Sequence, residues 1–172
     1  MYTLLSKLFR EEAFITIIII SLQVSSLKAE PFKDISQIQA LAQELSITHE
    51  LPWELVYALI QVESKWDTSA VSDKSCYGLM QIRASIHAQG IESEKLFNPE
   101  LNLSIGLPFL KMLLTKHAPD TVRALAFYNA GYRWQRGVGY AKRVLREKEN
   151  FLLTRSNKVY GSSMLLSGRP SN

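Results

Sequence analysis

Glu63 is the first residue of this sequence whose type and position could support chemistry. It ends the apolar helical stretch ALIQVE, and helical spacing from Leu59 and Ile60 places its carboxyl group on the face that turns toward the core. Burial on one side raises the pKa of a carboxyl group, and the negative end of a helix dipole acts in the same direction. A carboxylic acid still protonated near neutral pH can serve as general acid toward a glycosidic oxygen. A helix-terminal glutamate bonded to a neighbouring helix would show the same pattern.

Two further stretches carry groups that suit a sugar. The tetrapeptide GLMQ at residues 78–81 offers close backbone approach at its glycine, an adaptable apolar side chain, and an amide that donates and accepts hydrogen bonds. The stretch AFYNAG at residues 126–131 contains Tyr128, whose hydroxyl could reach a buried carboxyl, and Asn129, which could bond backbone or ligand. A helix start with a core methionine, and a core aromatic with a helix cap, are the structural alternatives.

The elements that must position these groups are helical. Apolar periodicity, with Asp34, Asn98 and Asp120 as caps, predicts helices at residues 35–45, 52–64, 78–89, 99–117, 121–130 and 140–150. Pro108 is expected to kink or divide the fourth of them, and Gly131 to end the fifth as a left-handed terminator. No strand alternation longer than a few residues occurs, so the fold class is a small all-α domain.

Composition narrows the possible partners and cofactors. Of the 172 residues, 47% are hydrophobic and 21% charged, which allows an ordinary globular core. The net charge of +4 is compatible with an anionic polymer, but without a dense Lys/Arg tract we expect no nucleic acid partner. Cys76 is the single cysteine, and His49, His87 and His117 are scattered without ligand spacing. We therefore expect neither a metal nor another cofactor.

The two ends of the chain differ from its middle. Residues 1–29 begin with basic residues, continue with an apolar run and end in small residues, the order of a secretory signal peptide. The run is shorter than the roughly 20 residues of a membrane-spanning helix, although an uncleaved anchor or a buried segment is the alternative. Residues 30–155 form the expected domain. Residues 156–172 are rich in Ser, Gly and Asn and are expected to form a flexible tail.

The ordered set of motifs resembles the lytic transglycosylase (SLT-domain) family, which has a goose-lysozyme-like fold with a substrate cleft. The resemblance covers about residues 51–145. Its landmarks are Glu63-Ser64, Ser72, GLMQ at residues 78–81, Asn102, Gly106, FL at residues 109–110, and ALAFYNAG at residues 124–131.

This resemblance implies an enzyme that cleaves the β-1,4 bond from N-acetylmuramic acid to N-acetylglucosamine in peptidoglycan. Glu63 matches the sole catalytic acid and base, and the product is a 1,6-anhydro ring formed without water. Tyr128 matches the tyrosine that holds the catalytic glutamate. The positions that match those at the sugar sites are Ser72, Gly78, Met80, Gln81 and Asn129.

Several departures from the family pattern concern the shape of the cleft. Ser75-Cys76 replaces the usual Gly-Ala before GLMQ, and Arg83-Ala84 stands where a proline usually follows. Pro108 interrupts a helix that normally lacks it. None of these departures removes a catalytic group.

Two alternative functions stay open, together with the cellular role. A hydrolytic lysozyme of similar fold would use Asp67 or Asp73 as a second carboxylate, whereas a non-catalytic peptidoglycan-binding assembly module would need no acid at all. The short chain resembles specialised members that accompany secretion and conjugation machines. It implies action in the periplasm, with peptidoglycan strands and components of such a machine as partners, and with no membrane span after signal cleavage.

Overall fold

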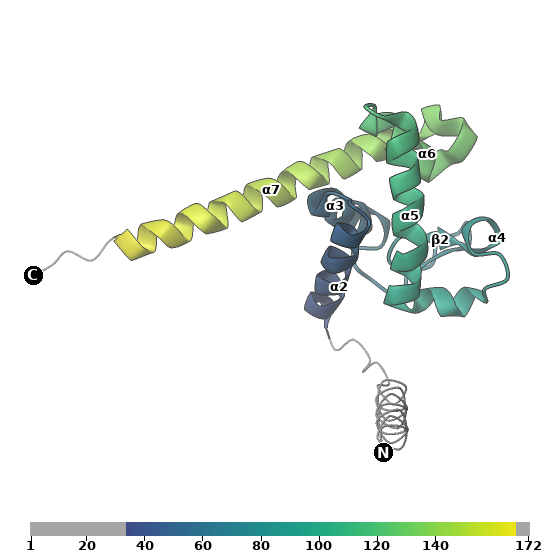
Figure 1. Ribbon diagram of the computed structural model, residues 1–172, viewed down its shortest axis with the longest axis horizontal. Helices are drawn as coiled ribbons and strands as arrows, with labels where there is room; N and C mark the ends of the chain where they lie inside the picture. The colour runs from purple at the N-terminus through teal and green to yellow at the C-terminus, as the bar shows by residue number, and fades with distance from the viewer. Residues whose placement is uncertain (1–33, 168–172) are drawn as a thin grey trace, which may run out of the picture. The chain divides into compact units, whose positions relative to one another are not determined.

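The computed structural model describes residues 34–167, so the expected signal segment lies outside the described residues (Figure 1). In chain order the elements are α2 (Ile35–Thr48), α3 (Trp53–Glu63), β1 (Cys76–Tyr77), β2 (Ile82–Arg83), α4 (Ala84–His87), the 3-10 helix η1 (Ser93–Phe97), α5 (Pro99–His117), α6 (Thr121–Ala130), the 3-10 helix η2 (Gly131–Gly137) and α7 (Val138–Ser167). The described chain is thus almost entirely helical, as the periodicity predicts.

Three polar side chains fix where helices begin, as predicted. The Asp34 carboxylate accepts hydrogen bonds from the backbone N–H groups of the first turn of α2. The Asn98 side chain accepts from the N–H of Leu101, and Asp120 accepts from that of Arg123. Gly131 ends α6 with a positive φ of 55°, but its ψ of −134° is not that of a left-handed helical residue.

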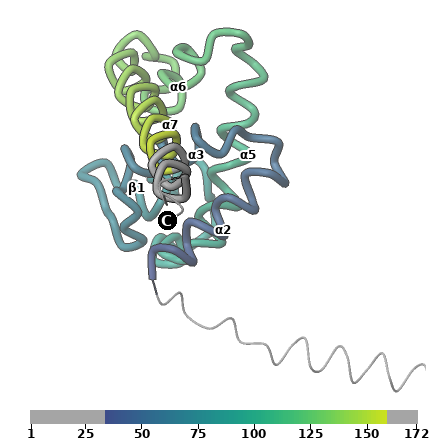
Figure 2. Tube along the Cα trace, turned by 90° about the vertical axis from the view of Figure 1, so that its left-hand side faces the viewer, coloured from purple at the N-terminus to yellow at the C-terminus, as the bar shows by residue number. Residues whose placement is uncertain are grey.

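The core lies where α7 packs on α3 and α6, and where α5 packs on α6 and α2. Figure 2, which looks nearly along α7, shows α3 and α6 beside it. Fully buried apolar side chains from these helices fill the interior, among them Leu59, Leu107, Leu125 and Val144. Burial of this surface holds α3 rigidly between its neighbours, and with it Glu63.

The prediction of one helix over residues 78–89 is wrong. Residues 76–83 form a hairpin in which Cys76 pairs with Arg83 and Tyr77 with Ile82, so GLMQ is the turn between two short strands. Gly78 and Gln81 have φ angles of 71° and 49°, and Ser75 has 55°. A helix cannot contain these angles, which glycine adopts most easily. Only the short helix α4 follows.

Pro108 does not divide α5, which continues through it from Pro99 to His117. Both Pro108 and Ser104, whose carbonyl loses its helical donor, are exposed, so water can satisfy that carbonyl.

At the other end of the chain, α7 runs on to Ser167, so helix continues into the segment expected to be a tail. Between residues 34 and 167, no helix has both the length and the apolar character needed to cross a membrane.

Candidate active site

Glu63 is the last residue of α3, and the packing of that helix determines its electrostatics. In the preceding turn Leu59 and Ile60 are fully buried, and Glu63 itself is half-buried. Burial raises the pKa of the Glu63 carboxyl group to about 7, against the weaker opposing effects of a Tyr140 hydrogen bond and the Arg143 charge. The carboxyl group is therefore substantially protonated at neutral pH, as the sequence predicts.

Tyr140 holds the carboxyl group from the first turn of α7. Its hydroxyl donates a hydrogen bond of 2.6 Å to Oε1 of Glu63, and its side chain is buried. The Arg143 guanidinium lies over the Tyr140 ring, 5.8 Å from its centre. Burial and the nearby Glu63 charge raise the pKa of Tyr140 well above its usual range, so the hydroxyl remains a donor.

The expectation that Tyr128 holds Glu63 differs from the structure. The Tyr128 hydroxyl instead donates a hydrogen bond of 2.8 Å to the carbonyl oxygen of Met80. Tyr128 is nevertheless close enough to Glu63 to be affected by its charge. Burial, and then the Glu63 charge, raise the pKa of Tyr128 well above the usual range. The two tyrosines therefore have different partners. The Tyr140 hydroxyl bonds the Glu63 carboxyl group, and the Tyr128 hydroxyl links α6 to the hairpin turn.

The GLMQ turn is held mainly through its backbone. Asn102 on α5 is fully buried; its Oδ1 accepts from the N–H of Met80, and its Nδ2 donates to the carbonyls of Tyr77 and Leu96, each at 2.8 Å. A Cβ at Gly78 would lie 2.5 Å from Asn102 Nδ2. The landmark asparagine is therefore a structural clamp for the turn.

The remaining predicted binding residues take different positions. Gly78 and Met80 are both buried, so the Met80 side chain is not accessible to a ligand. Both residues contribute through packing. Gln81 is half-buried and donates through Nε2 to the carbonyls of Ala70 at 3.2 Å and Gly78 at 3.0 Å. Ser72 Oγ accepts from the N–H of Cys76 at 3.2 Å.

Asn129 is exposed near the end of α6, one residue after Tyr128. Of the predicted residues, Ser72, Gln81 and Asn129 therefore keep part of their surface accessible, and Glu63 and Tyr128 are half-buried.

Comparison of the sequence with models of known protein families shows to which family the chain belongs. The family model of the transglycosylase SLT domain matches residues 40–150, more than half of the chain, and this range includes Glu63, GLMQ and both tyrosines. The chain belongs to the transglycosylase SLT domain family.

Relatives of this SLT-domain chain include two proteins named membrane-bound lytic murein transglycosylase F. That of Yersinia enterocolitica is 33% identical over 90 residues, which cover 48% of this chain and 18% of the relative. That of an Enterobacter species is 34% identical over 90 residues, covering 48% and 17%. The SLT-domain chain thus spans less than a fifth of the length of these curated relatives.

Solved structures share the fold. The 70-kDa soluble lytic transglycosylase of Escherichia coli superimposes with a TM-score of 0.57 at 22% identity, covering 63% of this chain and 23% of that one. A complex of the 70-kDa soluble lytic transglycosylase with bulgecin A gives a TM-score of 0.60 at 22% identity, covering 67% and 24%. The helices of the SLT domain are therefore arranged as in these enzymes.

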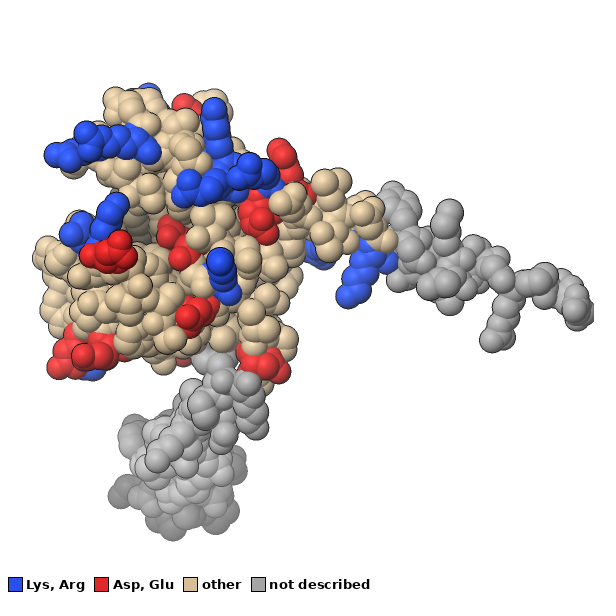
Figure 3. Space-filling view, turned by 180° about the vertical axis from the view of Figure 1, so that it is seen from behind, with Lys and Arg blue, Asp and Glu red and all other residues tan. Residues whose placement is uncertain are grey.

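The face shown in Figure 3 has a hollow below the part of the SLT domain that carries α6 and η2. Side chains of both signs lie beside it, Lys and Arg as well as Asp and Glu. Among residues 34–167, no group of three or more His, Cys, Asp and Glu side chains could hold a metal ion.

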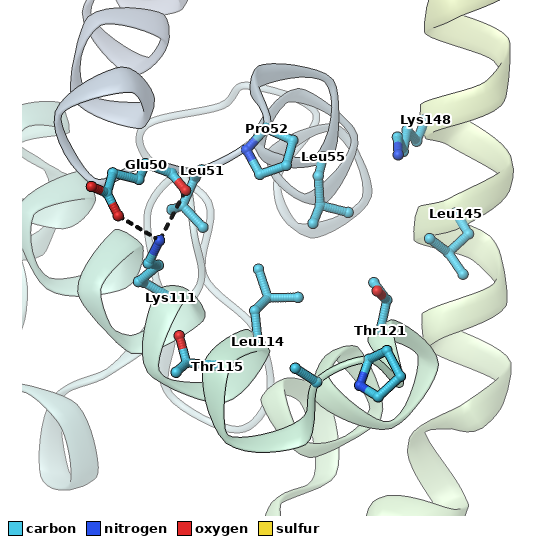
Figure 4. Close-up of a pocket in the computed structure, with 12 residues that line it drawn as sticks. Glu50, Leu51, Pro52, Leu55, Lys111, Leu114, Thr115, Thr121, Leu145 and Lys148 are labelled. Carbon is cyan, nitrogen blue, oxygen red and sulfur yellow. Dashed lines mark hydrogen bonds and ion pairs between the residues drawn. The ribbon is translucent and has the colours of Figure 1, made fainter.

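A second hollow lies at the opposite end of α3 from Glu63. This cavity of about 400 Å³ has a largely apolar lining that includes Leu55, Leu114 and Leu145 (Figure 4). At its edge, Lys111 Nζ donates to the carbonyl and to Oε2 of Glu50, each at 3.1 Å. None of the predicted site residues lines it.

Proposed function

We propose that this chain is a peptidoglycan lytic transglycosylase in which Glu63 serves as both acid and base. The observation that carries the proposal is a half-buried carboxyl group, whose pKa burial raises to about 7, held by a buried tyrosine hydroxyl. Membership of the SLT-domain family supports it, as do relatives named lytic murein transglycosylases. The reaction is cleavage of the β-1,4 bond between N-acetylmuramic acid and N-acetylglucosamine.

In the first half of the reaction, Glu63 donates its proton to the glycosidic oxygen, and the bond from that oxygen to the muramoyl anomeric carbon breaks. The muramoyl acetamido group assists at the anomeric carbon. The Glu63 carboxylate that remains is stabilised by the Tyr140 hydroxyl and by the Arg143 charge, the two influences that lower its pKa.

In the second half, the Glu63 carboxylate removes the proton of the muramoyl C6 hydroxyl. The oxygen of that hydroxyl bonds to the anomeric carbon, the bond from that carbon to the assisting acetamido oxygen breaks, and the 1,6-anhydro ring closes. Glu63 is protonated again, so the next turnover can begin without water or a second acid.

The surroundings of Glu63 favour this reaction over hydrolysis with a second carboxylate. Asp67 is exposed, and its Oδ1 accepts from both the N–H and the hydroxyl of Ser69, at 2.8 and 2.7 Å. Those bonds keep the pKa of Asp67 below its usual range, and Asp73 is exposed. Among the described residues, the groups that influence the pKa of Glu63 are Tyr140 and Arg143, and neither is a carboxylate.

Substrate contacts fall to Ser72, Gln81 and Asn129, which keep accessible surface, while Gly78 and Met80 shape the turn behind them.

For the cellular role, the signal-like pattern of residues 1–29 supports export to the periplasm. There the activity would open the wall locally for a secretion or conjugation machine.

Mass analysis of muropeptides tests the proposal. Purified peptidoglycan digested with the protein should yield anhydro ends, lighter by one water than reducing ends, and digests that contain only reducing ends would contradict it. Asp67→Asn and Asp73→Asn should retain turnover, because neither carboxylate takes part. If Glu63→Gln cleaves peptidoglycan as fast as wild type, Glu63 is not the general acid and the proposed mechanism is wrong.

A further inference from the structure

The chain turns sharply just after Glu63. Only Ser64 separates Glu63 from Lys65 and Trp66, whose φ angles are 55° and 68°. The left-handed region is uncommon for residues other than glycine, and here two long side chains occupy it in succession. Strain of this kind persists only where the surrounding structure holds it, and it gathers at functional sites. The turn therefore needs a contact that holds it in place.

The Trp66 indole ring makes that contact. Trp66 is buried, with 4% of its surface exposed, and its ring centre lies 5.3 Å from that of Tyr57 and 6.1 Å from that of Trp53. Both partners belong to α3, so the turn folds the chain back along this helix. Phe151 of α7 stacks on Tyr57 with ring centres 4.2 Å apart, which completes an aromatic cluster of these four residues. The position of Trp66 is thus fixed by α3 and α7 together.

Hydrogen bonds at the end of α3 transmit this position to Glu63. The N–H and Oγ of Ser64 both donate to the carbonyl of Ile60, at 3.0 and 3.3 Å. The N–H of Lys65 donates to the carbonyl of Gln61 at 3.2 Å. The last turn of α3 is therefore bonded to the residues of the strained turn, and Glu63 lies between them. A shift of the strained turn would move the Glu63 carboxyl group as well.

The ring of Trp66, rather than its N–H group, holds the turn. Its Nε1 is buried, and within residues 34–167 no acceptor pairs with it. A buried donor without a partner destabilises the folded state, so the packing of the ring has to outweigh that effect. A phenylalanine at this position would keep a ring in the cluster and remove the unpaired donor.

We propose that Trp66 is a positioning residue for Glu63, a role that rests on the proposed acid–base function of that glutamate. The Trp66 ring, packed in the aromatic cluster, holds the strained turn and thereby keeps the Glu63 carboxyl group against the Tyr140 hydroxyl. Helix α7 contacts both ends of this arrangement, through Tyr140 at the carboxyl group and through Phe151 in the cluster. Trp66 acts through the turn and takes no part in proton transfer.

Loss of the ring should expose the Glu63 carboxyl group to more water. Burial is the largest influence on its pKa, which it raises to about 7, so greater exposure lowers that pKa. The other groups that face it are Tyr140 and Arg143 of α7, which lower its pKa, and Tyr128 of α6, which is affected by its charge. A weakened Tyr140 bond would raise the pKa of Glu63, but burial is the larger influence. The carboxyl group should therefore titrate at lower pH when the ring is removed.

The pH dependence of turnover and the titration of Glu63 itself provide the test. We would measure kcat and KM on soluble peptidoglycan fragments from pH 5 to pH 9 for the full chain and for Trp66→Ala, Trp66→Leu and Trp66→Phe. NMR would follow the titration of the Glu63 Cδ, and circular dichroism would show that each variant is folded. Ile38→Ala is the control for general destabilisation. Ile38 is buried in α2, outside the aromatic cluster and outside the groups that influence the pKa of Glu63.

For Trp66→Ala and Trp66→Leu we expect kcat to fall roughly tenfold with KM almost unchanged. The alkaline limb of the pH–rate profile and the titration of Glu63 should both move to lower pH, by roughly one pH unit. Trp66→Leu provides the same test if Trp66→Ala does not fold. Trp66→Phe should restore the wild-type behaviour, and Ile38→Ala should lower the melting temperature alone.

A wild-type titration of Glu63 in the folded Trp66 variants would overturn the positioning role. An equal shift in Ile38→Ala, or no recovery in Trp66→Phe, would overturn it as well. If wild type forms no anhydro ends, the proposed function fails, whereas the NMR titration still tests whether Trp66 fixes the Glu63 carboxyl group.

Discussion

The Tyr140 hydroxyl and Oε1 of Glu63 lie 2.6 Å apart, although 77 positions separate the two residues in the sequence. The contact exists because α7 packs directly on α3. It places a permanent donor on the carboxyl group that, in the proposed reaction, loses a proton and then regains it. The packing of two helices thereby sets the acidity of the proposed catalyst, and the predictions below follow from that arrangement.

Replacing Glu63 with glutamine should strongly reduce cleavage. Loss of the general acid should lower turnover roughly 100-fold or more, as measured by release of muropeptides. Stability should respond with a definite pH dependence. The folded-state pKa of about 7 exceeds the ordinary 4.5, so wild type loses stability as pH rises between these values. The loss is at most roughly 3 kcal/mol.

Urea denaturation at pH 5 and pH 9 would measure this difference. Glu63→Gln and wild type should unfold at similar urea concentrations at pH 5, where the carboxyl group is protonated in the folded state. At pH 9 the variant should be the more stable protein, since only wild type carries a half-buried charge. A variant that is less stable than wild type at both pH values would contradict this account of Glu63.

Tyr140→Phe and Tyr128→Phe should separate the two tyrosines. Removing the Tyr140 hydroxyl raises the pKa of Glu63 and leaves its anion less stabilised, so turnover should fall roughly tenfold. The alkaline limb of the pH–rate profile should also move to higher pH. Tyr128→Phe removes the donor to the Met80 carbonyl, so its main effect should be a loss of about 1–2 kcal/mol of stability. If Tyr128→Phe alone moves the limb, the assignment of Tyr140 is wrong.

Arg143→Gln should shift the pH–rate profile without loss of fold. The Arg143 charge lowers the pKa of Glu63, so its removal raises that pKa and moves the alkaline limb upward. Initial rates measured from pH 5 to pH 9 would show the shift. Lys142→Gln is the matched control. Lys142 is exposed and is not among the groups that influence the pKa of Glu63, and its substitution removes the same unit of charge. Equal shifts in both variants would point to net charge as the cause.

Asn102→Ala should destabilise the domain by about 3 kcal/mol or more, because it leaves one buried N–H and two carbonyls without their partners. Thermal unfolding would measure the loss. Asn150→Ala, on the exposed surface of α7, removes only a hydrogen bond of 3.5 Å and should leave the melting temperature almost unchanged. If Asn102→Ala melts at nearly the same temperature as wild type, Asn102 does not stabilise the hairpin turn in the way inferred above.

Helix positions were predictable where the signal is local. Asp34, Asn98 and Asp120 bond N–H groups two or three residues away, and such short-range chemistry can be read from the sequence. The register that turns Glu63 toward the core is also local, since it depends on a single apolar stripe.

Local sequence patterns do not predict the hairpin or the contact between Tyr140 and Glu63. Positive φ angles at Ser75 and Gln81 depend on strand pairing that no periodicity encodes, so the sequence pattern predicts a helix where the structure has a turn. Tyr140 belongs to a basic amphipathic segment and lies far from Glu63 in the sequence. The available signal was its spacing with Val144, which places both on one face of α7, and both are buried.

Met80 is held at three points by different parts of the domain. Its N–H bonds Asn102, its carbonyl accepts from Tyr128, and its side chain would meet any Cβ placed at Gly106. The turn therefore cannot shift independently of α5 and α6. If the proposed glycan binds beside this turn, the glycan has to adapt its conformation to the turn.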